Sequence, residues 1–321
     1  MKKRVLAVGE VNIDIVFTGL ANIPLSEQDT LAQGLEILVG GQTGTIARAM
    51  SGLGLDVTFV GRVGDDDYGR NAIHELSRAG VNVSGIVVDP SLTTGTTVVL
   101  STGTERAYAT YLGSISEVRR SDIKPDLLSS ADHLHVGSYY LQRVLRPDML
   151  DLFQVAKRSG LTTSIDPGWD SFKEWGKDIF DVLRYVDVFL PNEVEAMAIA
   201  EATSPEQALE ILANYSSTVI VKMGREGCLA RDSAQRLCCP AFNVPVVDVT
   251  SSGDIFNAGY LYGFLNGWGL AEAVKFANAC GAMSVSKPGS AGIMSGVAEV
   301  KEFLAVREGE VTTQGSQVSV S

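Results

Sequence analysis

The chain has 321 residues, of which 45% are hydrophobic, so it is long enough to bury a substantial core. Acidic residues outnumber basic residues by 38 to 26, and the resulting surface is expected to repel nucleic acid and anionic lipid. No segment is long and uncharged enough to span a membrane, and charged residues interrupt the first apolar run before it reaches signal-peptide length. We therefore expect a cytoplasmic protein.

Apolar, β-rich segments alternate with helical patterns along most of the chain. We expect buried strands at 5–9, 57–63, 133–138, 162–166, 186–190 and 219–223. Helices are expected between them at 44–52, 68–79, 148–159, 193–201 and 205–214. This alternation is typical of parallel strands joined by crossover helices. The predicted fold class is α/β, a doubly wound and mainly parallel sheet with helices on both faces.

Two segments break this rhythm. Residues 13–38 and 84–112 alternate apolar and polar side chains between Gly and Thr turns, which predicts a small antiparallel sheet that stands beside the main domain as a lid. Within the second segment, Arg106 could close over a substrate, form a seam between two subunits, or lie on a solvated strand face. Residues 1–306 are expected to form a single domain, and the polar composition of 307–321 predicts a disordered tail.

The segment 248–254 carries the clearest chemical signal. It reads Asp-Val-Thr-Ser-Ser-Gly-Asp and precedes an apolar helix pattern. Small residues before a helix let a ligand approach the first amides, which have no partner inside the helix, so Ser251, Ser252 and Gly253 predict an anion site. Asp254 could accept the proton of an attacking hydroxyl. The spacing Ser251-x-x-Asp254 is also that of a capping box, in which Asp254 would only stabilise the helix.

Other polar and glycine motifs follow a recognisable order. Residues 9–14 read Gly-Glu-Val-Asn-Ile-Asp, and residues 40–47 read Gly-Gly-Gln-Thr-Gly-Thr-Ile-Ala ahead of a helix pattern. Asn192-x-x-Glu195 comes later, followed by residues 222–227, Lys-Met-Gly-Arg-Glu-Gly. With the segment 248–254 and a late helix around Asn278, these motifs resemble the signatures of PfkB, ribokinase-like carbohydrate kinases.

The resemblance implies a role for each motif. It implies that Asp254 is the catalytic base and that Ser251, Ser252 and Gly253 form the anion hole. The residues implied to bind a sugar are Asp14, Gly40, Gly41, Gln42 and Thr45. Those implied to border ATP are Asn192, Lys222, Gly224, Gly227 and Asn278, and Glu195 is implied to organise Mg²⁺ through water.

The chain departs from the family pattern at three of these positions, and at one of them Ser252 replaces the usual Ala. Thr45 stands where the family usually carries Asn, so one polar contact to the sugar is altered. Ser251 stands at a usual Gly, where a Cβ could narrow the anion site if a positive φ is needed.

Purely structural roles compete with several of these assignments. Asp14 could cap a turn, and Asn192 and Glu195 are residues that a helix N-terminus favours in any case. Gly224 and Gly227 could be hairpin glycines, and Asn278 a satisfied core polar group. His133 and His135 share one strand face, and we interpret them as structural rather than as metal ligands, because no cysteine lies near them in the sequence.

The function that the resemblance implies is an ATP-dependent sugar kinase of the ribokinase, fructokinase or ketodeoxygluconate kinase kind. Its cofactors would be ATP and Mg²⁺, with K⁺ as a further candidate, and a homodimer through the lid is a candidate assembly. The alternatives are a nucleoside kinase and a non-catalytic sugar or nucleotide sensor. A P-loop enzyme is excluded because the chain has no Gly-x-x-x-x-Gly-Lys-[Ser/Thr] segment. The sequence does not identify the sugar.

Overall fold

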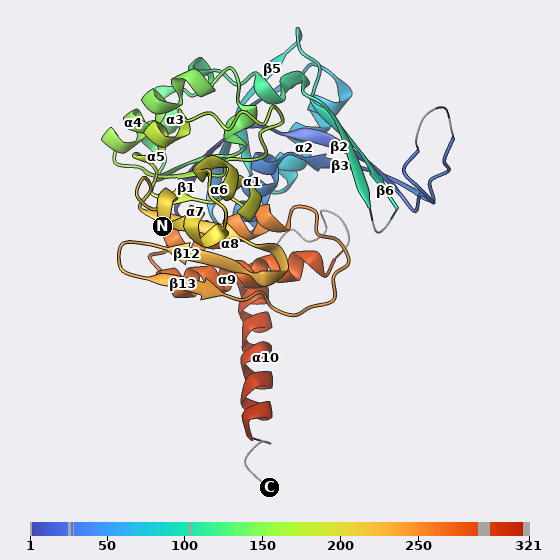
Figure 1. The fold of residues 1–321 in the computed structure, drawn as a ribbon. Helices are drawn as coiled ribbons and strands as arrows, with labels where there is room; N and C mark the ends of the chain where they lie inside the picture. The colour runs from blue at the N-terminus through green and yellow to red at the C-terminus, as the bar shows by residue number, and fades with distance from the viewer. Residues whose placement is uncertain (1, 25–26, 28, 103–104, 288–295, 317–321) are drawn as a thin grey trace.

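The computed structural model describes residues 2–24, 27, 29–102, 105–287 and 296–316, which form two sheets and their covering helices (Figure 1). The larger sheet has the strand order β13-β12-β11-β10-β9-β8-β1-β4-β5. Its strands are β1 (Arg4–Val8), β4 (Asp56–Gly64), β5 (Asn82–Asp89), β8 (His133–Val136), β9 (Thr162–Ile165), β10 (Val188–Phe189), β11 (Thr218–Lys222), β12 (Cys228–Arg231) and β13 (Arg236–Cys239). Pairing is parallel from β5 to β11 and antiparallel from β11 to β13. The strands predicted from apolar runs are confirmed.

Helices cover both faces of this sheet. One face carries α1 (Gln42–Gly52), α2 (Asp67–Arg78), α8 (Ser252–Leu265) and α9 (Leu270–Val285). The other carries α3 (Pro125–Ser130), α4 (Met149–Arg158), α5 (Ile179–Leu183), α6 (Glu193–Ala200) and α7 (Pro205–Leu212). Alternate residues of β1 enter the two cores, Val5 and Ala7 on one side and Leu6 and Val8 on the other. Strands buried on both faces explain the continuous apolar runs, and the doubly wound class is confirmed.

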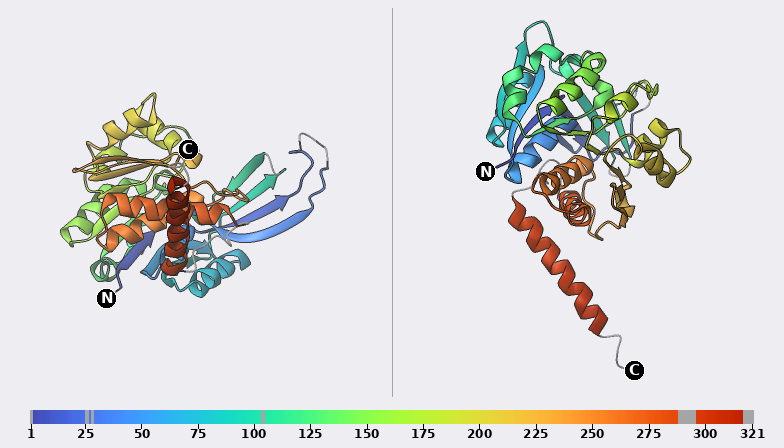
Figure 2. Two further views of the ribbon diagram at one scale, coloured as in Figure 1. Left: turned by 90° about the horizontal axis from the view of Figure 1, so that it is seen from below. Right: turned by 90° about the vertical axis from the view of Figure 1, so that its left-hand side faces the viewer.

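The lid is a separate sheet with the order β3-β2-β6-β7. Its strands are β2 (Asn12–Thr18), β3 (Gly34–Gly40), β6 (Thr96–Ser101) and β7 (Arg106–Tyr111), and they extend away from the main domain (Figure 2). The outer pairs are antiparallel, but β2 and β6 pair in parallel at the centre. The lid prediction was wrong for residues 84–89, which belong to β5 at the edge of the main sheet. An alternating edge strand and a lid strand have the same sequence pattern, so the pattern could not separate them.

The C-terminal helix α10 (Val297–Ser316) projects from the main domain (Figures 1 and 2). Its start is anchored by the fully buried Val300, with Phe303 and Leu304 packed against the same core. The sequence predicts disorder from residue 307 onward, whereas the structure continues the helix to Ser316. The rest of the predicted tail, 317–321, lies outside the described residues. No helix in the described part of the chain has the length and apolar character needed to cross a membrane.

Short 3₁₀ segments connect several of these elements: η1 (Gly113–Ser116), η2 (Arg120–Asp122), η3 (Tyr139–Leu141), η4 (Arg146–Asp148) and η5 (Gly224–Glu226). Polar residues lie at the carboxyl ends of four parallel strands: Glu10 after β1, Ser138 after β8, Asp166 after β9 and Lys222 at the end of β11. The carboxyl ends of parallel strands meet at one edge of a sheet, which is the usual place for a binding site.

Candidate active site

The N-terminus of α8 is open toward ligands. Ser251 precedes the helix with a φ of 60°, a left-handed conformation, and no side chain in the described part of the chain caps the helix. The amides of Gly253 and Asp254 have no partner among the described residues, whereas the Ser252 amide donates to Val249 O at 3.3 Å. A positive φ is therefore required where the family usually has Gly, and the capping-box alternative for Asp254 is wrong. Of the predicted anion hole, Gly253 offers its amide freely, but Ser252 does not in this conformation.

Asp254 lies in the same turn and is only partly exposed. Burial raises its pKa well above the ordinary range for Asp, and the negative charges of Asp166, Glu10 and Glu195 act in the same direction, against the opposing effect of Lys222. A carboxylate with a raised pKa is a better proton acceptor for a hydroxyl. The environment of Asp254 therefore suits a general base.

Lys222 places a positive charge beside the N-terminus of α8. Its ammonium lies 2.7 Å from Asp166 Oδ2, and Asn257 Nδ2 donates to the same oxygen at 2.5 Å. A Cβ built on Gly253 would lie 3.8 Å from Lys222 Nζ, so the ammonium is adjacent to the open amides of α8. Burial acts to lower the pKa of Lys222, but the surrounding carboxylates outweigh it and raise the pKa. A charged lysine beside free amides can hold a phosphate group.

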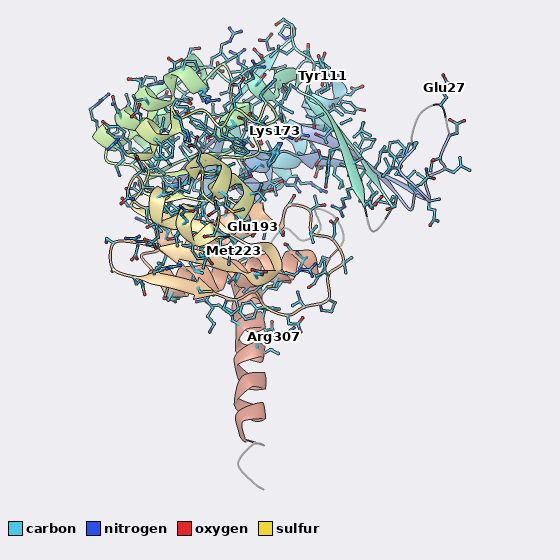
Figure 3. The ribbon with its side chains drawn as sticks, viewed as in Figure 1. Glu27, Tyr111, Lys173, Glu193, Met223 and Arg307 are labelled. Atoms are coloured by element: carbon cyan, nitrogen blue, oxygen red, sulfur yellow. The ribbon has the colours of Figure 1, made fainter. Side chains whose placement is uncertain are left out.

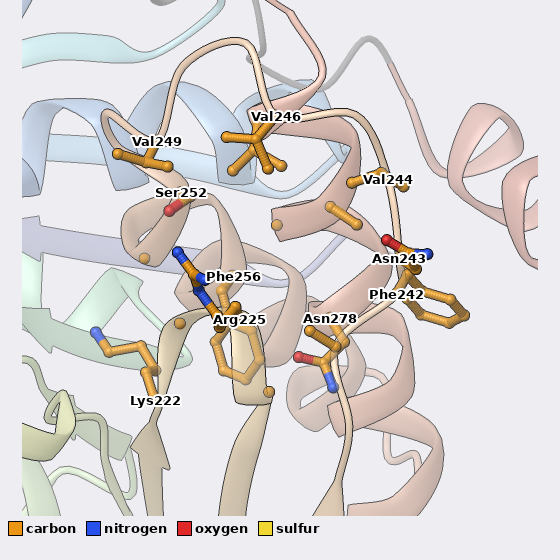
Figure 4. A pocket seen from close by; sticks show the side chains of 17 residues that line it. Lys222, Arg225, Phe242, Asn243, Val244, Val246, Val249, Ser252, Phe256 and Asn278 are labelled. Carbon is orange, nitrogen blue, oxygen red and sulfur yellow. The ribbon is translucent and has the colours of Figure 1, made fainter. Parts of the chain in front are cut away.

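A pocket of about 850 Å³ opens next to this corner (Figure 4). The residues predicted for the anion hole and for ATP that line it are Lys222, Gly224, Gly227, Ser252, Gly253 and Asn278. Its floor includes Phe256, and apolar side chains of the segment before α8 form another wall. A pocket with apolar walls and a charged, amide-rich end matches the shape and polarity of a nucleotide.

The glycines of this pocket serve different purposes. Gly227 has a φ of 94°, and a Cβ there would lie 2.0 Å from Cys239 O, so a side chain is excluded by the packing of β13. Gly224 has a φ of 55° and faces open space. Asn278 donates from Nδ2 to Cys239 O and Pro240 O at 3.3 Å each, so it anchors the end of β13 while lining the pocket.

Asn192 and Glu195 form a complete capping box on α6. Glu195 N donates to Asn192 Oδ1 at 2.9 Å, and Asn192 N donates to Glu195 Oε2 at 2.8 Å. The structural role weighed from the sequence is therefore present. The other carboxylate oxygen of Glu195 receives no hydrogen bond from the described residues, so it can still face a cation. The side-chain oxygen of Asn192 already accepts the capping hydrogen bond from Glu195 N.

Glu195 also suits a water-mediated contact to magnesium. Burial raises its pKa to about 7, with Asp166 adding to the shift and Lys222 opposing it. Within the described ranges, no three acidic, His or Cys side chains converge to hold a metal on their own. Magnesium is usually held by one or two carboxylates together with water and phosphate oxygens, and one free carboxylate oxygen fits that pattern.

The raised pKa of Glu195 predicts how stability depends on pH. The folded state keeps this proton up to about pH 7, whereas the unfolded state loses it near its ordinary value of 4.5, so stability should fall as the pH rises between these values. We expect the thermal unfolding midpoint of the ligand-free protein to fall from pH 5 to pH 7.5, and to fall less in Glu195→Gln. A variant with the same slope as the native protein would contradict the assignment.

Asp14 lies at the base of the lid. Asn12 Nδ2 donates to Asp14 Oδ1 at 2.8 Å and to Thr97 Oγ1 at 3.2 Å, so the carboxylate is held in place by a neighbouring strand residue. Gly40 lies so close that a Cβ would come within 2.1 Å of Asp14 Oδ2. Gly41 has a φ of 85° at the start of α1. The glycine pair therefore makes space for Asp14 and for the turn into the helix.

This crowding gives a prediction for Gly40→Ala. The added methyl should displace Asp14 and raise the KM for the sugar about ten- to a hundredfold, the loss of one hydrogen bond to a charged group. The KM for ATP should change little, since the nucleotide pocket lies elsewhere. Gly269→Ala is the matched control, because a Cβ there meets nothing within 4 Å. Equal kinetics of the two variants would remove Asp14 from the sugar site.

Gln42 and Thr45 face the interior rather than an open cleft. Gln42 Oε1 accepts from Ser138 N at 2.6 Å, and Thr45 is buried on α1. Ser138 also donates to Glu10 Oε1 at 2.7 Å, and Thr43 donates to Glu10 Oε2 at 2.9 Å. Burial raises the pKa of Glu10. Glu10, Asp166 and Asn257 were not assigned from the sequence, although Glu10 directly follows one predicted strand and Asp166 ends another.

Arg106 connects the lid to the segment before α8. Its Nη2 lies 2.7 Å from Asp248 Oδ1, and its Nη1 donates to Thr250 Oγ1. Thr250 donates to the same Asp248 oxygen from N at 2.9 Å and from Oγ1 at 2.7 Å. These contacts join a lid strand to the segment that precedes the anion site.

The comparisons with known proteins agree with this architecture. The sequence profile described as pfkB family carbohydrate kinase matches residues 2–295. The ATP-dependent ribose-1-phosphate kinase of Halopiger xanaduensis is 28% identical over 291 residues, covering 89% of this chain and 93% of that protein. Fructokinase-1 of Zea mays is 29% identical over 323 residues, with coverages of 94% and 98%.

A solved structure shares the fold. The putative ribokinase II from E. coli in complex with ATP and Mg²⁺ superimposes with a TM-score of 0.82 at 23% identity, covering 95% of this chain and 99% of that one. The chain belongs to the pfkB family of carbohydrate kinases. It is a phosphotransferase with a hydroxyl group as acceptor, and its fold is ribokinase-like.

Proposed function

We propose that this chain transfers the terminal phosphoryl group of ATP to a sugar hydroxyl, with Asp254 as the base. The observation that carries the proposal is the meeting of three groups at the N-terminus of α8. The Gly253 amide and the Lys222 ammonium line the pocket, and the Asp254 carboxylate is close enough for its charge to act on Lys222. A base, an anion hole and a cation in one place are what phosphoryl transfer requires.

Each residue has a defined part in the transfer. Asp254 accepts the proton as the sugar oxygen attacks, and the Gly253 amide and Lys222 stabilise the charge on the migrating group. Ser251 holds the turn, and the Ser252 amide joins the anion hole once it releases Val249 O. Gly224, Gly227 and Asn278 line the nucleotide pocket, Asn192 holds Glu195 through the capping box, and Glu195 would hold Mg²⁺ through water. Magnesium, when bound, neutralises charge on the phosphates.

The acceptor site favours a polyhydroxylated molecule. Asp14, Asn12, Thr97 and Thr110 point from one face of the lid, and Thr97 Oγ1 lies 3.1 Å from Thr110 Oγ1. With Gly40 and Gly41 at its base, this face offers several polar groups to hydroxyls, and the inward-facing Gln42 and Thr45 are left out of the proposed contacts. By their names, the related ribose-1-phosphate kinase acts on a sugar phosphate and the fructokinases act on a sugar. A nucleoside kinase is the second candidate.

An ADP-release screen tests the proposal. Sugars, sugar phosphates, sugar acids and nucleosides should be compared with Mg²⁺ and ATP, and Asp254→Asn protein provides the blank. ADP formation above the blank with a sugar is the expected result, and formation only with nucleosides supports the second candidate. Tight binding of a sugar without ADP release would identify a sensor and sink the kinase proposal.

Two assignments about the working conditions complete the proposal. K⁺ is a candidate activator, which a comparison of rates in K⁺ and tetramethylammonium salts would test. The four cysteines are free, which supports a reducing compartment such as the cytoplasm.

We also propose a homodimer through the lid. Side chains directly opposite in a sheet share a face, and the strand register places one apolar row across all four strands. This row consists of Ile37, Ile15, Val98 and Ala109. The opposite face carries Asp14 and Arg106, so the apolar face points away from the site. Figure 3 shows Tyr111 on β7 and Glu27 at the far end of the segment between β2 and β3.

The exposure of this face gives a testable prediction. Ile37 is 52% exposed and Leu35 is 57% exposed, and large exposed apolar side chains on one face mark an association surface. Ile37→Glu should reduce the mass measured by sedimentation from that of a dimer to that of a monomer. Glu36→Lys changes the neighbouring residue on the other face and should leave the mass unchanged. A native protein that sediments as a monomer at micromolar concentration would contradict the dimer.

A further inference from the structure

A buried polar chain beneath α8 has no part in the steps above. His133 Nδ1 lies 2.8 Å from Thr162 Oγ1 and its Nε2 lies 2.7 Å from Ser164 Oγ, while His135 Nδ1 lies 2.8 Å from the same Ser164 oxygen. Both histidines and Ser164 are fully buried. Burial lowers the pKa of His133 well below its usual value and that of His135 to about 4, so both rings are neutral. Each ring then has one donor and one acceptor nitrogen.

This row of hydrogen-bonded side chains leads toward Asp166 and the N-terminus of α8. Asp166 extends β9 on the face that the two histidines occupy, and α8 covers that face. Near the start of α8, Asn257 donates to Asp166, and near its end Phe264 contacts the His133 ring with 6.2 Å between ring centroids. His135 therefore lies beneath the helix, between Asp166, which contacts Asn257, and His133, which contacts Phe264.

Two buried atoms in this region lack a protein partner within the described residues. They are His135 Nε2 and Asn257 Oδ1. The single hydroxyl proton of Ser164 can go to His135 Nδ1, and Nε2 then carries the ring proton. Asn257 Oδ1 is an acceptor, so the two atoms are complementary. Leaving both unpaired would carry the full cost of burying a polar group.

We infer that His135 is a positioning residue for Lys222. As the Nε2–H tautomer it holds Asn257 Oδ1 through one buried water, because the two atoms make no direct hydrogen bond, and this keeps Asn257 Nδ2 directed at Asp166. Without that hold, the amide of Asn257 can rotate and present its oxygen to the Asp166 carboxylate. Asp166 would then move away and take the Lys222 ammonium with it, because the two groups are 2.7 Å apart.

The tautomer can be read directly by NMR. The chain has three histidines, and the third, His74, has an exposed side chain, so a long-range ¹H–¹⁵N spectrum of protein labelled with ¹⁵N-histidine is simple to assign. We expect His135 to be neutral at pH 7 with its proton on Nε2. A proton on Nδ1 would overturn the inference. This readout needs no turnover, so it stands apart from the proposed kinase function on which the inference rests.

Two variants test the effect on the site. His135→Leu removes the donor, whereas His135→Gln keeps an N–H donor at the end of a side chain of similar reach. In folded His135→Leu we expect ATP affinity by calorimetry and kcat each to fall about tenfold, the scale of a small misplacement of a reacting group, with KM for the sugar unchanged. His135→Gln should stay within about twofold of native. Native-like ATP affinity and kcat in folded His135→Leu would refute the positioning role.

Discussion

Asp254→Asn protein is expected to turn over at least about a hundredfold more slowly than the native protein, because a positioned general base contributes about 10²- to 10⁴-fold to the rate. The amide is nearly isosteric and cannot accept the proton. Binding of ATP and sugar should be almost unchanged, since the substitution removes stabilisation of the transition state only. Single-turnover rates and calorimetric affinities measure the two quantities separately.

Asp67→Asn is a matched control for this variant. Asp67 and Asp254 are both acidic residues in the first turn of a helix, but Asp67 lies on α2 with its side chain 97% exposed. Both substitutions remove a carboxylate that is favourable near a helix N-terminus, and only one affects the proposed chemistry. A rate for Asp254→Asn that equals that of Asp67→Asn would exclude Asp254 as the base.

Lys222→Met is expected to have the second large effect. Asp166 is fully buried, and the Lys222 side chain is only 13% exposed, so the substitution leaves a buried carboxylate without its cation. Breaking such a pair from one side costs about 3–5 kcal/mol of unfolding free energy. ATP affinity should also fall, because the ammonium beside Gly253 is lost. Denaturant unfolding and calorimetry with ATP measure the two effects.

A second substitution separates the electrostatic cost from a general loss of packing. In Lys222→Met/Asp166→Asn the unpaired charge is gone, so much of the stability should return while ATP affinity stays low. Lys157→Met is the matched control, because Lys157 lies 2.7 Å from Asp187 Oδ2 in a more exposed pair and should cost no more than about 1 kcal/mol. Equal losses for Lys157→Met and Lys222→Met would contradict the proposed electrostatic cluster.

Two similar sequence patterns in this chain form different structures at the start of their helices. Ser251-x-x-Asp254 and Asn192-x-x-Glu195 both match the spacing of a capping box, but only the second forms one. Ser251 takes a φ of 60°, which turns its side chain away from the capping geometry, whereas Asn192 has extended backbone. The conformation of the residue before each helix depends on the surrounding loops, so a spacing of three residues could not distinguish an anion site from a cap.

Local patterns determined much of this protein from the sequence alone. Apolar runs placed the parallel strands, glycines and small residues marked the turns at Gly41 and Ser251, and the order of the motifs indicated the family. Each of these signals lies within a few neighbouring residues, where backbone preference and periodicity act directly.

Only the tertiary structure decided which distant residues meet. Arg106 contacts Asp248 across 142 positions, Lys222 pairs with Asp166 across 56, and Asn257 reaches Asp166 across 91. The parallel pairing of β2 with β6 and the place of β5 in the main sheet have no sequence signal of their own. Burial and the charges of neighbours raise the pKa of Asp254, and both arise from the packing of strand ends against α8 rather than from the residues beside it in the chain.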